Sequence, residues 1–274
     1  TYDWVEIATI GTDIGLNDDG GGQDETVQVD LPFDFTYYGE AYDRVSICSN
    51  GWLAFGDDTY LPLYRNWMLP ADGSPDAMVA AFWDDLADGE TYVHHDAAEH
   101  RYIVQWDGYG SSNNSGHDYF SGNCTFQIIL YDPAYHGTDS GDGRIEIQYQ
   151  AVTVNADEST YFTVGLQNEA QDDGLTYAYG NDYAGGAASV QPGRAIALVP
   201  VVPQAQGTLT GDVTNSSDGG TPIGGAVVTV LGSGRQLASG ADGVFSGGVP
   251  VGVWDVAVYH DSFAPDTTYG VTVV

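Results

Sequence analysis

The chain has 274 residues, of which 39 are acidic and only six are basic, and all six basic residues are arginine. The net charge of −33 argues against binding to nucleic acid or to an anionic membrane surface, because both partners require clustered cations. No stretch approaches the ~20 apolar residues that a membrane-spanning helix needs, so no membrane insertion is expected. The length suits one large β domain or two smaller ones.

The first segment, TYDWVEIATI at residues 1–10, has the composition of a strand. It lacks the basic start and the continuous apolar centre of a secretion signal. Either the chain is cytosolic, or residue 1 is the mature end of an exported protein. We favour the second interpretation, which predicts an extracellular or cell-surface location.

Two acidic segments are candidate calcium sites, because Ca²⁺ prefers hard oxygen ligands on loops between strands. Neither segment has the EF-hand spacing, and the alternative for each is a solvated acidic loop. The candidate ligands are Asn17, Asp18, Asp19, Asp24 and Glu25 in the first segment, and Asp84, Asp85, Asp88 and Glu90 in the second.

Alternating and short apolar runs predict strands along most of the chain. Phe33, Phe35 and Tyr37 alternate with polar residues, so that strand is expected to bury one aromatic face. The segment RVSICSNGWLAFG at residues 44–56 predicts a hairpin that turns on Ser-Asn-Gly. Only residues 74–86 favour a helical turn, since a proline follows a serine cap there.

The segment HHDAAEH at residues 94–100 contains His94, His95, Glu99 and His100. A zinc hydrolase motif of the H-E-x-x-H kind needs two histidines one helical turn apart on a helix, and this spacing differs. The segment lies between two strand patterns, which favours the tip of a hairpin over a metal site.

Two cysteines and three glycosylation sequons fit an exported protein. Cys48 and Cys124 both lie in predicted strands, and an even pair suggests a disulfide. Such a bridge would close a loop of about 77 residues and contribute about 4 kcal/mol. The alternative is two separate buried thiols. The sequons begin at Asn113, Asn123 and Asn215.

The whole pattern predicts an all-β fold with two domains. A large β-sandwich or jelly-roll-like domain is expected over residues 1–200, and a small Ig-like Greek-key sandwich over residues 207–274. The linker at residues 201–206 lies within PVVPQAQG at residues 200–207, where two prolines and a Gln/Ala/Gly run interrupt the strands. From Ala205 onward the charge is −5, so the preceding part holds −28 of the total of −33.

The predicted small domain, residues 207–274, resembles the carboxypeptidase regulatory-like, or prealbumin-like, domain. This resemblance implies a non-catalytic spacer or interaction module of secreted and surface proteins. The residues that carry it are Gly207, Gly211, Val213, Pro222, Ile223, Gly225, Ala226, Val228, Val230, Asp242, Gly243, Phe245, Gly252, Trp254, Val256 and Val258.

The predicted large domain, residues 1–200, resembles β-rich modules of large secreted bacterial surface proteins. It resembles the nidogen-like extracellular domain more distantly. The resemblance lies in LPFDFTYYGEAYDRVSICSNGWLAFG at residues 31–56, MVAAFWDDL at residues 78–86 and GDGRIEIQYQAV at residues 141–152. It implies an adhesive or structural role without enzymatic activity.

Motifs of enzyme chemistry are missing from the sequence. No Gly-x-Ser-x-Gly elbow occurs, and the glycine run at residues 20–22 precedes acidic residues instead of a phosphate-binding lysine. We therefore expect no enzyme. The first hypothesis is a structural subunit of an extracellular fibre or surface layer that polymerises head to tail with copies of itself. The alternative is a glycan-binding or accessory module of a larger secreted hydrolase, suggested by 19 tyrosines and six tryptophans.

Overall fold

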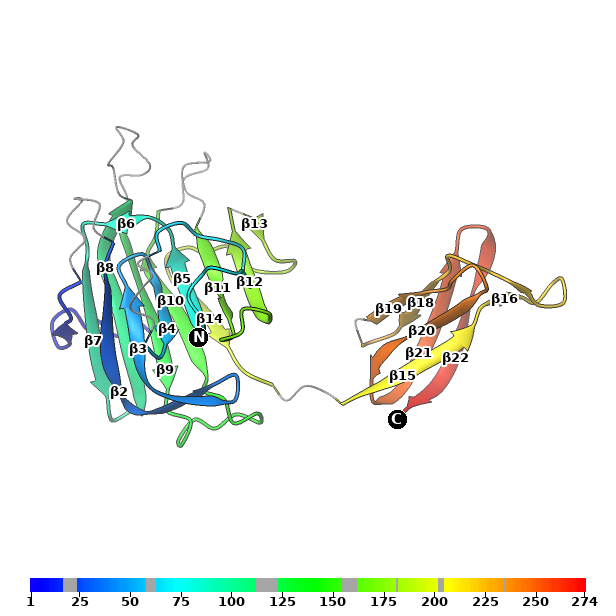
Figure 1. Cartoon of the computed structure of the whole chain (residues 1–274), viewed down its shortest axis with the longest axis horizontal. Helices are drawn as coiled ribbons and strands as arrows, with labels where there is room; N and C mark the ends of the chain where they lie inside the picture. The colour runs from blue at the N-terminus through cyan, green and yellow to red at the C-terminus, as the bar shows by residue number, and fades with distance from the viewer. Residues whose placement is uncertain are drawn as a thin grey trace. The chain divides into compact units, whose positions relative to one another are not determined.

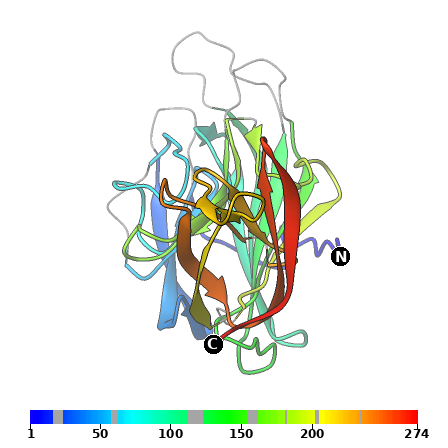
Figure 2. The same ribbon diagram turned by 90° about the vertical axis from the view of Figure 1, so that its right-hand side faces the viewer.

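The computed structural model describes residues 1–16, 24–57, 63–111, 123–153, 162–180, 182–201, 205–233 and 235–274. It divides into two compact units, Thr1–Val201 and Val202–Val274. Strands make up both units, and no helix occurs among the described residues (Figures 1 and 2). None of these residues therefore forms a helix that could cross a membrane. The all-β prediction is confirmed.

The first unit consists of two antiparallel sheets of seven strands each. Sheet 1 contains β1 (Thr12–Asp13), β7 (Glu90–Asp96), β8 (Arg101–Ser111), β9 (Cys124–Tyr131), β10 (Ile145–Ala151) and β14 (Arg194–Leu198) in this order, with β6 (Leu86–Ala87) paired to β8. Sheet 2 contains β13 (Asp182–Tyr183), β12 (Gly174–Tyr179), β11 (Thr163–Gln167), β5 (Met78–Trp83), β4 (Trp52–Phe55), β3 (Glu40–Cys48) and β2 (Thr26–Tyr37).

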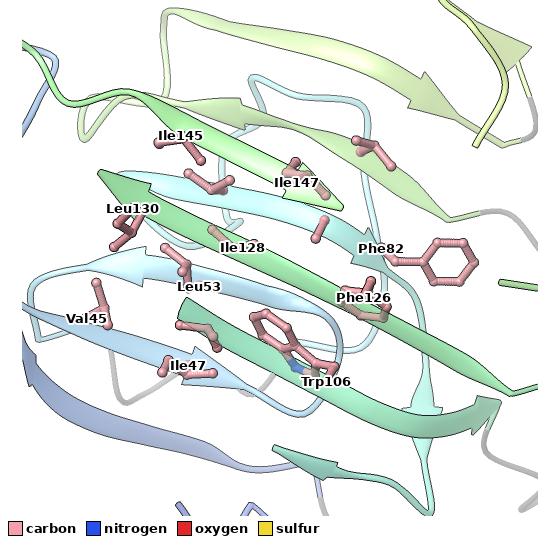
Figure 3. Close-up of a cluster of buried hydrophobic side chains, with 14 of the residues drawn as sticks. Val45, Ile47, Leu53, Phe82, Trp106, Phe126, Ile128, Leu130, Ile145 and Ile147 are labelled. Carbon is pink, nitrogen blue, oxygen red and sulfur yellow. The ribbon is translucent and has the colours of Figure 1, made fainter. Parts of the chain in front are cut away.

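The main core of this unit lies between the two sheets. Sheet 2 contributes Val45, Ile47, Leu53 and Phe82, and these side chains face Trp106, Phe126, Ile128, Leu130, Ile145 and Ile147 of sheet 1 (Figure 3). The predicted aromatic face of β2 is confirmed, because Phe35 and Tyr37 are buried in this core while Asp34 is exposed. The rings of Phe35 and Phe55 stack with their centroids 5.0 Å apart.

The hairpin predicted at Ser-Asn-Gly is confirmed, because Cys48 of β3 pairs with Trp52 of β4 across the turn. Gly51 has a φ of 78°, in the left-handed region that glycine tolerates best. A Cβ atom at this position would overlap the carbonyl oxygen of Phe82. Glycine is therefore required both by the backbone conformation and by the close approach of β5.

The helical turn expected within residues 74–86 is wrong, because Met78–Trp83 is strand β5 with every side chain buried. Strand β5 lies between β4 and β11 in the middle of sheet 2. One of its faces contacts the inter-sheet core and the other contacts a separate cluster around Trp52. A strand buried on both faces has no polar alternation, so its sequence is easily mistaken for a helical run.

The second unit is a small sandwich. One layer is the pair β15 (Gln206–Asp212) and β20 (Val244–Pro250), and β16 (Thr214–Asn215) pairs with β17 (Thr221–Pro222). The other layer, sheet 3, has the order β19 (Arg235–Ala238), β18 (Val227–Val230), β21 (Gly252–His260) and β22 (Phe263–Val273). Leu209 and Val249 of the first layer pack with Val228 and Val256 of sheet 3.

Candidate functional site

Residues 3–11, which we call the strap, cross the outer face of sheet 1 instead of forming the strand expected at residues 1–10. The backbone N–H of Asp3 donates to Gln148 on β10 at 2.9 Å. Further along, the carbonyl of Val5 accepts a hydrogen bond from Gln127 on β9 at 2.7 Å. The strap therefore runs across the strands, and side chains of the sheet satisfy its backbone.

Three buried glutamines hold the strap. Gln105, Gln127 and Gln148 lie side by side on β8, β9 and β10, because the register pairs Gln105 with Gln127 and Gln127 with Gln148. The Nε2 atom of Gln127 donates to Oε1 of Gln105 at 2.7 Å, and that oxygen also accepts from the N–H of Ile7 at 3.2 Å. We call this row the glutamine ladder.

Sequence reasoning missed the glutamine ladder, although a signal was present. Each glutamine stands between two large apolar residues, in VQW, FQI and IQY. A polar amide at the centre of three consecutive strands needs a partner when it is buried. The repeated pattern therefore indicates a segment that covers this face of the sheet.

The structure does not contain the disulfide predicted between Cys48 and Cys124, since both residues are free buried thiols. Cys48 belongs to the cluster on the outer face of sheet 2, whereas Cys124 belongs to the core between the sheets. Successive side chains of a strand point to opposite faces, so Cys48 points away from the core that Ile47 enters. Burial raises the pKa of each thiol to about 12.

The two predicted acidic segments meet at the Ser-Asn-Gly turn. Asn50 donates from Nδ2 to Oδ1 of Asp24 at 2.8 Å, and its Oδ1 accepts from the N–H of Leu86 at 3.0 Å. Burial, followed by the charge of Asp24, raises the pKa of Asp85 to about 6. Asn17, Asp18 and Asp19 lie outside the described residues.

Glu25, Asp88 and Glu90 do not converge on one point with Asp24 and Asp85. Glu25 is half-buried beside the turn, where its N–H donates to Ser49 Oγ at 3.3 Å. Asp88 and Glu90 are exposed, and Glu90 accepts a hydrogen bond from the Tyr92 hydroxyl. Within the described ranges, no three acidic, histidine or cysteine side chains are placed to hold a metal. Calcium binding therefore stays a prediction.

Asp84 differs from the other candidate calcium ligands of its segment because it is only 4% exposed. Its Oδ1 accepts from the N–H of Asp85 at 2.9 Å, whereas its Oδ2 has no hydrogen-bond partner in the described part of the chain. Burial raises the pKa of Asp84 to about 7. The charge of Asp84 also adds to the effect of burial on the pKa of Cys124.

The hairpin tip predicted around His94, His95, Glu99 and His100 is confirmed. Strands β7 and β8 pair down to Asp96 and Arg101, which form an ion pair at 3.0 Å. The backbone carbonyl of Glu99 lies 2.9 Å from Nε2 of His136, and His100 stacks on Tyr135. The histidines thus take part in ring packing and hydrogen bonding at the tip.

The three sequons have different surroundings. Asn113 lies outside the described residues. Asn123 is exposed, and its Oδ1 accepts from Thr125 Oγ1 at 3.1 Å. In the second unit, Asn215 donates from Nδ2 to Asp218 at 2.9 Å. Glycosylation stays a prediction at all three positions.

An apolar surface with little charge lies on sheet 3, on the side away from its core. Val227 and Tyr259 pair directly across β18 and β21, and they are 38% and 55% exposed. Val253, at 67% exposed, follows on the same side of β21. We call the residues of β18 and β21 on this side the outer face of sheet 3: Val227, Thr229, Val253, Asp255, Ala257 and Tyr259. Asp255 is the one charged residue among them, and its Oδ1 accepts from the N–H of Gly270 at 2.9 Å.

A different apolar surface lies on the first unit, on residues 63–69, which we call the Trp67 loop. Trp67 is 49% exposed and Met68 is 59% exposed. The loop is fixed to sheet 2, because Asn66 donates to Thr163 at 3.0 Å and the N–H of Leu69 donates to Thr176 at 2.9 Å. Its exposed side chains are therefore presented by an anchored backbone.

Comparison with protein families finds that residues 1–206 match the family described as NIDO related. No curated protein and no solved structure matches the chain. The family match supports the nidogen-like resemblance, whereas the carboxypeptidase regulatory-like resemblance stays a prediction. NIDO-related domains are typical of extracellular proteins. Because the match covers more than half of the chain, this chain belongs to the NIDO-related family.

Proposed function

We propose that this chain is a non-catalytic structural module of an extracellular assembly, in which copies join head to tail. The observation that carries the proposal is the outer face of sheet 3. Contiguous exposed apolar residues mark interaction surfaces. In a protein with a net charge of −33, a surface with a single carboxylate is where another acidic copy meets the least repulsion.

The Trp67 loop supplies the complementary surface. It belongs to the first unit, whereas the outer face of sheet 3 belongs to the second. Tryptophan and methionine are enriched in protein interfaces, where large apolar side chains fill the centre of the contact. A contact between two different surfaces is heterologous, so it continues from copy to copy unless the rotation closes a ring.

Val227→Glu tests the outer face of sheet 3. The substitution places a charge beside Tyr259, so light scattering of the concentrated protein should show monomers where the parent chain shows polymers. Val244→Glu is a matched control, because Val244 is similarly exposed at 41% but lies on β20 in the other layer. The control variant should polymerise like the parent.

Trp67→Ala tests the other surface and the polarity of the contact. This variant should also be monomeric by light scattering. A mixture of Val227→Glu and Trp67→Ala retains one intact surface on each partner, so it should form 1:1 dimers and nothing longer. A monomeric parent chain at high concentration would overturn the proposal, and so would a Val227→Glu variant that still polymerises.

A further inference from the structure

The second unit contains a groove of about 570 Å³ at one end of its sandwich. The turn after β16 forms one wall, and the tip of the β21–β22 hairpin forms the other. Val213, Ile223 and Val258 line it with apolar side chains that are buried or half-buried. The groove is the place where the core between the two layers opens, and its volume lies within the ~300–1,000 Å³ of small-molecule sites.

Polar groups on both walls are available to a ligand. Asp212 and Thr214 stand on one wall and Thr268 on the other, and no side chain of these three bonds to another described residue. His260 accepts at Nδ1 from the N–H of Ser262 at 3.1 Å. This bond fixes the neutral tautomer with hydrogen on Nε2, so the second ring nitrogen is a donor.

An aromatic ring lies beside these polar groups. Phe263 is 38% exposed and lines the groove, and its centroid is 5.2 Å from that of His260. The flat face of an aromatic ring packs well against the C–H face of a sugar ring. Hydroxyl groups both donate and accept hydrogen bonds, as the hydroxyls of a sugar do.

We infer that this groove binds a short neutral carbohydrate. Asp212 and Asp266 place two carboxylates on its walls, in a segment of net charge −5, so phosphate, sulfate and acidic sugars are repelled. Donors on the same walls distinguish the groove from a cation site, which would need oxygen ligands only. An aromatic face together with mixed donors and acceptors matches a polyhydroxylated ring.

This activity goes beyond the proposed assembly and uses a different surface. Val258 and His260 point into the groove, whereas Tyr259 between them points to the outer face of sheet 3. The two sides of β21 can therefore be occupied together, and each can be disabled without the other.

The experiment uses the full chain with maltotriose, cellotriose and N,N′-diacetylchitobiose as probes. Saturation-transfer NMR and calorimetry should detect binding of at least one probe. Phe263→Ala and Asp212→Asn should each weaken that binding at least tenfold, because they remove the stacking face and a hydrogen-bond acceptor. Tyr259→Ala is the control and should bind as the parent chain does while its assembly weakens.

The inference is overturned if none of the three probes binds. It is also overturned if binding survives both Phe263→Ala and Asp212→Asn, or if trigalacturonate binds as tightly as the neutral probes. These readouts are independent of light scattering, so a failure here leaves the assembly proposal standing, and a monomeric chain leaves carbohydrate binding standing.

Discussion

At Asp84 the fold buries a carboxyl, and one of its oxygens has no hydrogen-bond partner among the described residues. Burial raises its pKa to about 7, from the ordinary value of 3.8. An acid whose pKa is higher in the folded state binds its proton more tightly there than in the unfolded chain. Its contribution to stability is therefore fully present below about pH 4 and is lost as the pH rises to about 7.

Asp84→Asn should remove this dependence. Three pH units correspond to a loss of about 4 kcal/mol for the parent chain between pH 4 and pH 7. In urea denaturation with chelator present, the variant should match the parent near pH 4 and be more stable by a few kcal/mol at pH 8. The difference between the two chains isolates Asp84 from the many other carboxylates.

Asp88→Asn is the control for this measurement, because Asp88 is exposed and lies just after β6, four residues from Asp84. Its φ of 61° suits asparagine as well as aspartate. The control should leave the pH profile unchanged. A lower stability of Asp84→Asn at pH 8 would contradict the protonation argument, since it would mean that the folded state favours the ionised carboxylate.

The cysteines show how far residue-level reasoning reaches. Alternation within β3 places Cys48 on the face opposite to Ile47, and this parity is visible in the sequence. Alternation does not reveal which face meets sheet 1, because both faces of β3 end in apolar or buried residues. The disulfide prediction was therefore wrong because the sequence lacks information that only the packing of the two sheets supplies.

At the scale of elements, the strap is held by the glutamine ladder and by a small apolar cluster. Ile7 is fully buried against Ile103 and Ile129 on the outer face of sheet 1. Gln127 bonds both to the strap and to Gln105. It is thus the central residue of the ladder and also one of the residues that hold the strap.

Gln127→Ala should loosen the strap. Two hydrogen bonds disappear and buried polar groups lose their partner, which costs about 2–4 kcal/mol. Hydrogen–deuterium exchange should become faster at residues 3–11, and urea denaturation should show lower stability. Peptic digestion suits this chain, because it has no lysine and only six arginines for trypsin.

The matched control is Gln28→Ala, because Gln28 is exposed and its amide bonds to Asp57 on the surface. It should change stability by less than about 1 kcal/mol and leave the strap protected. Unchanged exchange at residues 3–11 in Gln127→Ala would show that the apolar cluster alone holds the strap.

Strand β2 was predictable from its one wet face, whereas β5, which has none, was not. Phe33, Phe35 and Tyr37 alternate with polar residues, so β2 follows from local sequence. The run Met78–Trp83 has no alternation, and only its position in the middle of sheet 2 makes it a strand. The strap satisfies its backbone with side chains instead of a neighbouring strand, which no period of apolar residues reveals.

At the scale of the whole molecule, charge is divided unequally between the units. The part before Ala205 carries −28 of the total of −33. Crowded carboxylates repel one another in the folded state. A divalent cation that binds only the folded first unit would offset this repulsion.

We therefore expect calcium to stabilise the first unit. A site that is saturated at one hundred times its Kd adds about 2.7 kcal/mol. Excess chelator at fixed ionic strength should then lower the melting temperature by about 5 °C or more, and added calcium should restore it. An unchanged melt in chelator, at both low and high salt, would leave solvation and screening by salt as the sole means of tolerating the charge.

The two surfaces to which we assign functions, the outer face of sheet 3 and the groove of the second unit, were largely invisible to sequence reasoning. Val227 and Tyr259 become neighbours only through the pairing of β18 with β21. The groove likewise joins Asp212 to Thr268, which belong to opposite layers. Both surfaces depend on contacts between distant segments, whereas the boundary near residue 201 follows from local composition.

The direction of the strap matters when the chain is pulled. Because it crosses β10, β9 and β8 in turn, tension applied at residue 1 would meet the three glutamine anchors one after another. Anchors loaded in sequence release at lower force than a pair of strands sheared along its length. The nine freed residues of the strap would add at most about 32 Å of reach. The first unit would thus yield as an extensible tether while its core stays folded.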